Sequence, residues 1–241
     1  MNIPAIKGTI DRRILINFTV DPDIIARIIP APFKPKVYHG KAIVGICLIR
    51  LKKIRPKGFP GLISLSSENG AHRIAVEWIE NGETREGVFI PRRDTSSKIN
   101  SFVGGKIFPG RHYHADFNVN EANGRFYIAF KSSDDTTIEI DANKTEIFSP
   151  NSIFQSLANA SKFFQGGAVG YSPNGNRFEG LELKTFNWKV EPLSVSAVHS
   201  SFFEDESVFP KGSVQFDNAL LMTNVDHEWH SVKQKDQVKQ L

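Results

Sequence analysis

The sequence predicts a mainly β protein of the α+β type, in which antiparallel strands close into a β-barrel decorated by a few short helices. Three observations support this prediction. Roughly eight to ten short segments are rich in β-branched and aromatic residues and are bounded by turn-forming residues. Asn-Gly pairs, which favour tight hairpin turns, separate two pairs of these segments. The 19 Phe residues favour a sheet-rich core.

The first part of the chain predicts a strand and a helix, followed by more strands. Ile14–Val20 is apolar and β-branched, and it ends at Asp21 and Pro22. Asp21 can cap a helix that accepts proline in its first turn, and isoleucines at helical spacing continue until Pro30. The strands expected next, of which the last two form a hairpin through Asn81 and Gly82, are 41–51, 71–79 and 86–90.

The second part predicts two helices and further strands. A short helix is expected after Thr95, with Gly104 and Gly105 at its end. A longer amphipathic helix is expected from Ser149 to about Gly166. The strands expected here, of which the first two form a hairpin through Asn123 and Gly124, are 112–119, 125–130, 180–190, 193–203 and 213–221.

The chain length of 241 residues suits one all-β barrel, and neither a repeat nor a linker divides the sequence. We therefore expect a single domain over 1–230 and a polar tail over 231–241. Three lysines and one aspartate in the last nine residues account for +2 of the net charge of +4. The rest is nearly balanced and has no basic stripe with interleaved aromatics, so we expect no nucleic-acid partner.

The sequence predicts a cytoplasmic protein that does not bind membranes. No apolar run approaches the roughly 18 residues that a membrane span needs, and the first residues lack the pattern of a signal peptide. Cys47 is the single cysteine, so no intrachain disulfide can form, which agrees with a reducing compartment. Its apolar neighbours indicate a buried structural thiol.

Several segments, spread over nearly the whole chain to about Trp229, carry a family resemblance. They are Asn17–Pro22, Ile28–Pro32, Ser66–Gly70, Pro91–Ser97, Phe108–His112, Gly167–Tyr171 and Gly180–Leu183. Together they resemble the YqjF-like family, a domain of unknown function that is similar to acetoacetate decarboxylases. The resemblance implies an acetoacetate decarboxylase-like barrel that encloses a funnel. Because relatives in that superfamily assemble, a homo-oligomer is expected by analogy.

The resemblance also implies a chemical difference at one position. In the decarboxylases a lysine forms a Schiff base with a β-keto acid, and a second lysine beside it lowers the pKa of the first. The matching segment here is Phe108–Arg111, where Gly110 offers no amine and Arg111 keeps a cation that can hardly lose its proton. Lys106 lies about 13 Å away along an extended strand. We therefore expect no Schiff-base decarboxylase activity.

Other candidate site residues come from the same comparison and from local chemistry. Glu68 matches a family segment with an active-site glutamate, and we take it as catalytic. Arg13 matches a basic substrate-binding residue of the first strand, although a one-residue gap leaves Arg12 open. Arg92 and Arg93 precede a predicted helix, where guanidinium groups and free N–H groups together suit a carboxylate or a phosphate. Since neighbouring strand residues face opposite ways, at most one of the two points into a barrel.

Two histidines follow Gly110 at strand spacing. His112 and His114 share one face, and if Gly110 marks the funnel wall, both point into the funnel as acid–base groups or polar contacts. In the alternative interpretation Tyr113, Ala115 and their neighbours face the core and the histidines face water. We assign no metal, because ligands on one strand need a further partner that the sequence does not identify.

Two kinds of function follow from these residues. The first is an enzyme that acts on a small oxo- or hydroxy-acid, with Arg111 or Arg93 holding the carboxylate and with Glu68 and a histidine moving protons. The second is a non-catalytic barrel that binds the same small carboxylate. A purely structural role is the weakest alternative, because many polar groups fall in segments expected to line the funnel. Neither enzyme nor binding protein would need a cofactor.

Overall fold

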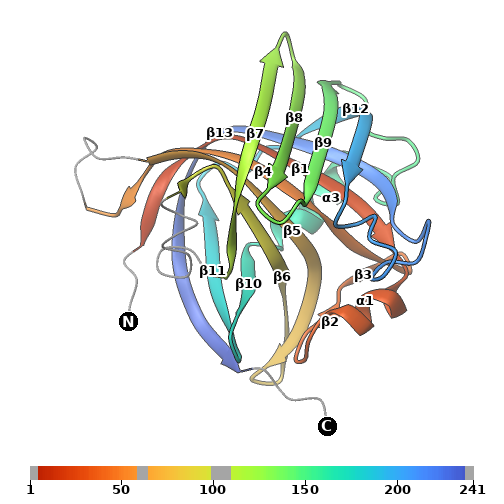
Figure 1. Ribbon diagram of the computed structural model, residues 1–241. Coiled ribbons are helices and arrows are strands. Elements are labelled where there is room, and N and C mark those ends of the chain that lie inside the picture. Colours follow the sequence, from red (N-terminus) through yellow and green to blue (C-terminus); the bar gives the residue numbers. More distant parts are fainter. Residues whose placement is uncertain (1–4, 59–64, 99–109, 237–241) are drawn as a thin grey trace.

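A computed structural model describes residues 5–58, 65–98 and 110–236, the last four by their backbone alone. These residues form two α-helices, α1 (Pro22–Ile28) and α3 (Leu157–Gln165), and one 13-stranded sheet (Figure 1). The strands are β1 (Ile6–Val20), β2 (Lys34–Pro35), β3 (Val37–Tyr38), β4 (Lys41–Pro56), β5 (Leu65–Glu80), β6 (Glu83–Thr95), β7 (His112–Ala122), β8 (Arg125–Ser132), β9 (Thr137–Lys144), β10 (Val169–Asn174), β11 (Arg177–Thr185), β12 (Glu191–Ser200) and β13 (Gln215–Asp236).

The strand pairings close the sheet into two rings that share the path β13-β1-β4-β5-β6. Figure 1 shows these shared strands as long, curved ribbons. One ring is completed by β10 and β11, because β10 pairs with β6 and β11 pairs with β13. The other is completed by β7, β8, β9 and β12, of which β7 pairs with β6 and β12 with β13. The fold is therefore mainly β, as predicted.

The sheet differs from the prediction in one respect, since it is not wholly antiparallel. Strand β6 runs parallel to both β7 and β10. Parallel neighbours need a crossover connection of a dozen or more residues, and 96–111 between β6 and β7 provides one. The short helix predicted in that connection, with Gly104 and Gly105 at its end, lies outside the described residues, and so does Lys106.

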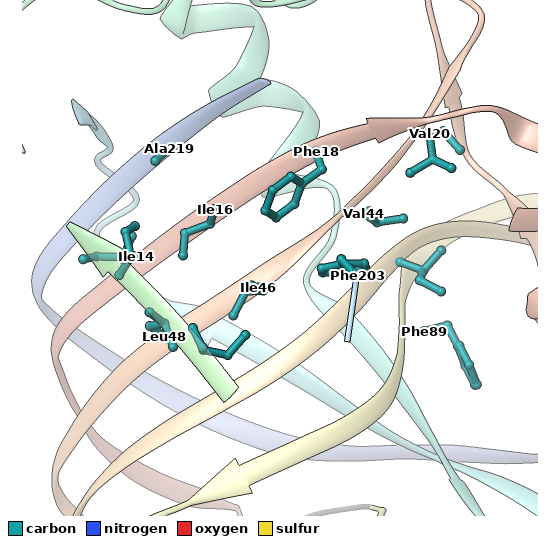
Figure 2. Close-up of a cluster of buried hydrophobic side chains, with 14 of the residues drawn as sticks. Ile14, Ile16, Phe18, Val20, Val44, Ile46, Leu48, Phe89, Phe203 and Ala219 are labelled. Carbon is teal, nitrogen blue, oxygen red and sulfur yellow. The ribbon is translucent and has the colours of Figure 1, made fainter. Parts of the chain in front are cut away.

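Alternation along the shared strands divides the core into two clusters. In β1, Ile14, Ile16 and Phe18 belong to one cluster and Leu15 to the other. Figure 2 shows the first cluster, where these β1 side chains lie beside the side chains of Val44, Ile46 and Leu48. The second cluster includes Phe163 and Phe164 of α3. Because both faces are buried, these strands have continuous apolar runs instead of a polar–apolar alternation.

Local sequence signals predicted several elements correctly. Asn81 and Gly82 have φ values of 54° and 80°, and Asn123 and Gly124 have 51° and 80°. Positive φ at both central residues is the geometry that Asn-Gly hairpin turns require. Asp21 caps α1, since its carboxylate accepts a hydrogen bond from the N–H of Asp23 at 2.8 Å. Both hairpins and the first helix are therefore confirmed.

A helix was predicted to start at Ser149, and this start was wrong. Helix α3 begins only at Leu157, where the Ser156 side chain caps it. The preceding turns are held by Asp217 of β13, which accepts a hydrogen bond from the Ser152 hydroxyl at 2.7 Å. Polar side chains such as those of Ser152 and Asp217 compete with helical backbone hydrogen bonds. This long-range contact therefore moves the start of the helix about two turns toward the C-terminus.

Two features of the C-terminal half were not anticipated. Strands β9 and β10 were not predicted, and β13 runs on to Asp236, inside the segment 231–241 that we expected to be a tail. Its end pairs with β11, and Val232 packs against the first cluster. None of the described helices has the length and apolar character needed to span a membrane.

Candidate functional site

A cavity of about 120 Å³ lies within the ring that β10 and β11 complete. A cavity needs only about 10–15 Å³ of such volume to hold one water, so this one is large enough for a small ligand. Its walls are apolar residues of β4, β6, β11 and β13, interrupted by a small set of polar side chains. The polar residues at the cavity are Arg13, Cys47, Asn69, Arg73, Arg93, Asp94 and His112.

Arg13 and Cys47 meet on neighbouring strands. Arg13 lies on β1 with the parity of Leu15, which turns it toward the cavity and leaves Arg12 on the other face. The Arg13 Nε donates a hydrogen bond to Cys47 Sγ at 3.3 Å. The structure thus answers which of the two arginines lines the cavity, and Cys47 lines it as well.

Arg73 of β5 is the most deeply buried of the cavity arginines, with 5% of its surface exposed. Its guanidinium crosses β4 at Gly45 and donates a hydrogen bond to the side-chain oxygen of Asn17. A Cβ on Gly45 would lie 3.3 Å from Arg73 Nη2 and 2.2 Å from the carbonyl of Ile16, so only glycine leaves this passage open. Burial lowers the pKa of Arg73 to about 10, and the group therefore stays charged at neutral pH.

Arg93 and His112 lie together at the β6 side of the cavity. Arg93 Nε donates to the Ser172 hydroxyl at 3.3 Å, and burial lowers the pKa of Arg93 to about 10. His112 Nδ1 lies 3.2 Å from the carbonyl of Gly110, which can only accept, so Nδ1 carries the hydrogen. Burial and then the positive charge of Arg93 lower the pKa of His112 to about 4, which keeps its ring neutral at pH 7.

The cavity has an excess of positive charge. Among the described residues, none of Arg13, Arg73 and Arg93 forms an ion pair with a carboxylate. Asp94 is the only acidic residue at the cavity within the described ranges, and its carboxylate is bound by Arg92 on the opposite face of β6. Buried charges without a partner cost several kcal/mol each. The arrangement therefore favours a bound anion.

Comparison with known proteins places the chain in a family. A family model described as an uncharacterised conserved protein, DUF2071, matches residues 8–223. The chain belongs to this family. No curated protein matches this DUF2071 chain in sequence.

Solved structures similar to this DUF2071 protein share its fold at low sequence identity. Acetoacetate decarboxylase from Legionella pneumophila is 14% identical with a TM-score of 0.55, over 97% of this chain and 88% of that one. An acetoacetate decarboxylase-like enzyme from Sphingomonas wittichii RW1 is 9% identical with a TM-score of 0.59, over 99% and 94%. The enduracididine biosynthesis enzyme MppR, complexed with pyruvate, is 12% identical with a TM-score of 0.55, over 98% and 91%. The protein thus has the acetoacetate decarboxylase-like fold.

In this DUF2071 protein, Glu68 lies away from the cavity. It precedes Asn69 on β5 and faces the other side, where its carboxylate forms ion pairs with Arg12 and Arg50. Arg12 is almost wholly buried and lies 3.3 Å from a carboxylate oxygen of Glu121, which also bonds Arg50 at 3.0 Å. The two carboxylates and two guanidiniums balance one another, so this cluster ties β1, β4 and β5 to β7.

Three further predicted residues also lie apart from the cavity wall. Arg92 binds Asp94 and Asp134, and this guanidinium lowers the pKa of Asp134 to about 2. Arg111 is exposed, with its guanidinium 4.8 Å from the centre of the Tyr113 ring. His114 is half-buried and is not among the cavity residues.

The structure therefore brings together Arg13, Arg93 and His112 of the predicted residues, and adds Arg73 and Cys47. Arg73 could have been found by counting along β5, because it shares the parity of Asn69 and Ala71. Within the described ranges, no three His, Cys, Asp or Glu side chains gather in a way that could hold a metal ion.

Replacing Gly110 with alanine should destabilise the protein. Gly110 has a φ of 85°, and an added Cβ would lie 2.5 Å from the Cβ of Ser172. Positive φ costs a residue with a side chain about 1–2 kcal/mol, and the clash adds to this. Urea unfolding should show a loss of at least about 2 kcal/mol, part of which Ser172→Gly restores in the double variant. An unchanged free energy of unfolding for Gly110→Ala would contradict this geometry.

Proposed function

We propose that this protein binds a small oxo- or hydroxy-acid in the cavity, with the carboxylate held by arginine side chains. The supporting observation is the group of three guanidiniums, Arg13, Arg73 and Arg93, that have no carboxylate partner among the described residues. A planar guanidinium can donate two parallel hydrogen bonds to a carboxylate, which is the geometry of strong carboxylate sites. The small volume and apolar walls suit a short acid. The pyruvate complex of MppR, which has the same fold, points to the same class of ligand.

We further propose that the protein does not form a Schiff base with its ligand. Gly110 has no amine, and its backbone geometry leaves no room for a side chain. No lysine occurs among the described residues that line the cavity. Lys36 lines a smaller adjoining cavity, but it is ion-paired with Glu86 at 2.5 Å and lies over the Phe163 ring. An amine held in an ion pair is a poor nucleophile for a ketone.

Binding without turnover is the version of this proposal that the geometry supports better. A pKa of about 4 makes His112 a weak base at neutral pH, so its Nε2 suits accepting a hydrogen bond from a ligand hydroxyl better than proton abstraction. Glu68, the other candidate for proton transfer, is held by two guanidiniums on the opposite face of β5. Acid–base catalysis on the bound acid is the second candidate function, and His112 would be its proton-transfer group.

Calorimetric titration with pyruvate, lactate and acetoacetate tests binding. At least one acid should bind, and the neutral amide lactamide should not. Arg13→Gln should weaken binding roughly tenfold or more, because a hydrogen bond to a charged group is lost. Arg125→Gln, which removes a surface arginine paired with Asp141, is the matched control and should leave the affinity unchanged. If none of the acids binds, the proposal fails.

Borohydride trapping tests the second part of the proposal. The intact mass after incubation with each acid and borohydride should equal that of the untreated protein, whereas a stable adduct would show that a lysine forms an imine. Depletion of the acid, followed by NMR, separates the two candidate functions, because only an enzyme consumes its ligand.

A further inference from the structure

We infer that the preferred ligand is a short dicarboxylate, with one carboxylate held at each end of the cavity. This inference rests on the proposed function, because it names the class of acid for the same site. It comes from the way in which the positive side chains divide into two groups on opposite sides of a small, uncharged floor.

The first group is Arg13 and Arg73, which lie on either side of β4. Arg13 extends from β1 to Cys47 of β4, while Arg73 extends from β5 across Gly45 to Asn17 of β1. Each guanidinium therefore lies over β4. Burial is the main reason that the pKa of Arg73 is lowered to about 10, and the positive charge of Arg13 adds to the effect. The two charges are close enough to repel each other, and a carboxylate between them would relieve that repulsion.

The second group is Arg93 and His112. Arg93 lies on β6 and its guanidinium leans away from β5 to donate to Ser172 of β10. His112 lies beside it, because the two residues are register partners across β6 and β7. The positive charge of Arg93 contributes to the lowered pKa of this histidine. The neutral His112 adds a polar ring without adding charge, so this group can hold a second carboxylate through the guanidinium of Arg93.

The floor between the two groups consists of small, uncharged side chains. Cys47 pairs with Ala71 across β4 and β5, and Ala71 pairs with Arg93 across β5 and β6. Two strand spacings of about 4.8 Å therefore separate the backbone of Arg93 from that of Cys47. A ligand that reaches from Arg13 and Arg73 to Arg93 must cross this floor, which suits an acid with a short carbon chain between two carboxylates.

The charge balance supports the same ligand. Three guanidiniums line the cavity, and the carboxylate of Asp94 is already bound by Arg92. A monocarboxylate leaves two positive charges uncompensated in a poorly solvated place, whereas a dicarboxylate leaves one. A compact dianion such as phosphate has a similar charge, but its charge sits on a single group, so it cannot contact the Arg13–Arg73 group and the Arg93–His112 group at once.

Titration of the full chain with matched acids tests the inference. The pairs are succinate with butyrate and malonate with propionate, each pair having the same number of carbons, and inorganic phosphate is added as a single-headed dianion. The dicarboxylate of each pair should bind roughly 10- to 100-fold more tightly than its partner, as expected for one added charge-assisted contact. Phosphate should bind no better than the monocarboxylates.

The Arg93→Gln variant locates the second carboxylate. It should reduce dicarboxylate affinity to within about threefold of the monocarboxylate value and reduce monocarboxylate affinity much less, because the first group remains intact. Arg93→Lys, which keeps the charge, should retain part of the preference. Arg125→Gln should behave as the unaltered protein does, and circular dichroism checks that each variant is folded.

The outcomes separate this inference from the proposed function. Equal affinity for the two members of each pair, or an equal loss of both in Arg93→Gln, would overturn the dicarboxylate inference and leave binding of a small acid standing. Phosphate binding as tightly as succinate or malonate would overturn it in favour of a single-headed dianion. Failure of every acid to bind would remove both.

Discussion

Replacing Arg93 with methionine should raise the melting temperature of the ligand-free protein. Burial lowers the pKa of Arg93 to about 10, so at pH 7 the folded protein holds a charge that is better solvated in the unfolded chain. Methionine keeps much of the side-chain length without the charge. We expect a gain of about 1–3 kcal/mol in the free energy of unfolding, and about 2–4 °C in melting temperature for each kcal/mol at this chain size. Differential scanning calorimetry at pH 7 measures both.

The same variant should lose the tighter binding of dicarboxylates, so stability and binding move in opposite directions, as they often do at functional sites. Arg125→Met is the control, because the Arg125 side chain is 58% exposed and pairs with Asp141 at the surface. Its effect should stay within about 0.5 kcal/mol. A large loss of stability in Arg93→Met would mean that this arginine has a structural role, and would count against a site built for an anion.

Acidification should unfold the protein well above pH 4. Burial is the first cause that lowers the pKa of His72 to about 3, and those of His112 and His227 to about 4. In the unfolded chain these residues titrate near pH 6.5. As the pH falls below about 6.5, these histidines become protonated in the unfolded state but stay neutral in the folded state, so the free energy of unfolding falls. Each histidine should cost about 2 kcal/mol between pH 7 and pH 5, which urea unfolding at both pH values measures.

His72→Phe isolates one of these contributions. The imidazole is fully buried, and its two nitrogens have no hydrogen-bond partner among the described residues. Its ring packs 4.4 Å from that of Phe202 and 5.6 Å from that of Phe203. Phenylalanine should therefore preserve the stability at pH 7 and remove about 2 kcal/mol of the loss at pH 5. His199→Gln, at the surface beside Glu204, should leave the pH dependence as it is. An equal acid sensitivity in His72→Phe would show that His72 is not responsible.

Local signals in the sequence predicted the local structure correctly. They failed where contacts between residues distant in sequence determine the structure. The Asn-Gly hairpins and the Asp21 cap depend on backbone preferences of two to four residues, which the sequence shows directly. The start of α3 depends on Asp217, which is distant in sequence. The parallel pairings of β6 are also set by packing of the whole sheet, which no short pattern encodes.

The candidate site was predictable in part for the same reason. Alternation implied that only one of Arg92 and Arg93 could face inward, and the structure places Arg93 at the cavity. The family resemblance suggested Glu68, but parity along β5 turns it to the face opposite Asn69 and Arg73. Finding Arg73 required knowing that β5 runs unbroken from Leu65 and which of its faces lines the cavity.

The pairing of β13 has a consequence for synthesis of the protein. This strand pairs with β1, β11 and β12, and so takes part in both rings. Strand β1 leaves the ribosome before its partner β13, which is synthesised about two hundred residues later. During translation the backbone N–H and C=O groups on the edge of β1 that faces β13 stay unpaired, and an open edge of this kind can pair with other chains until β13 is made.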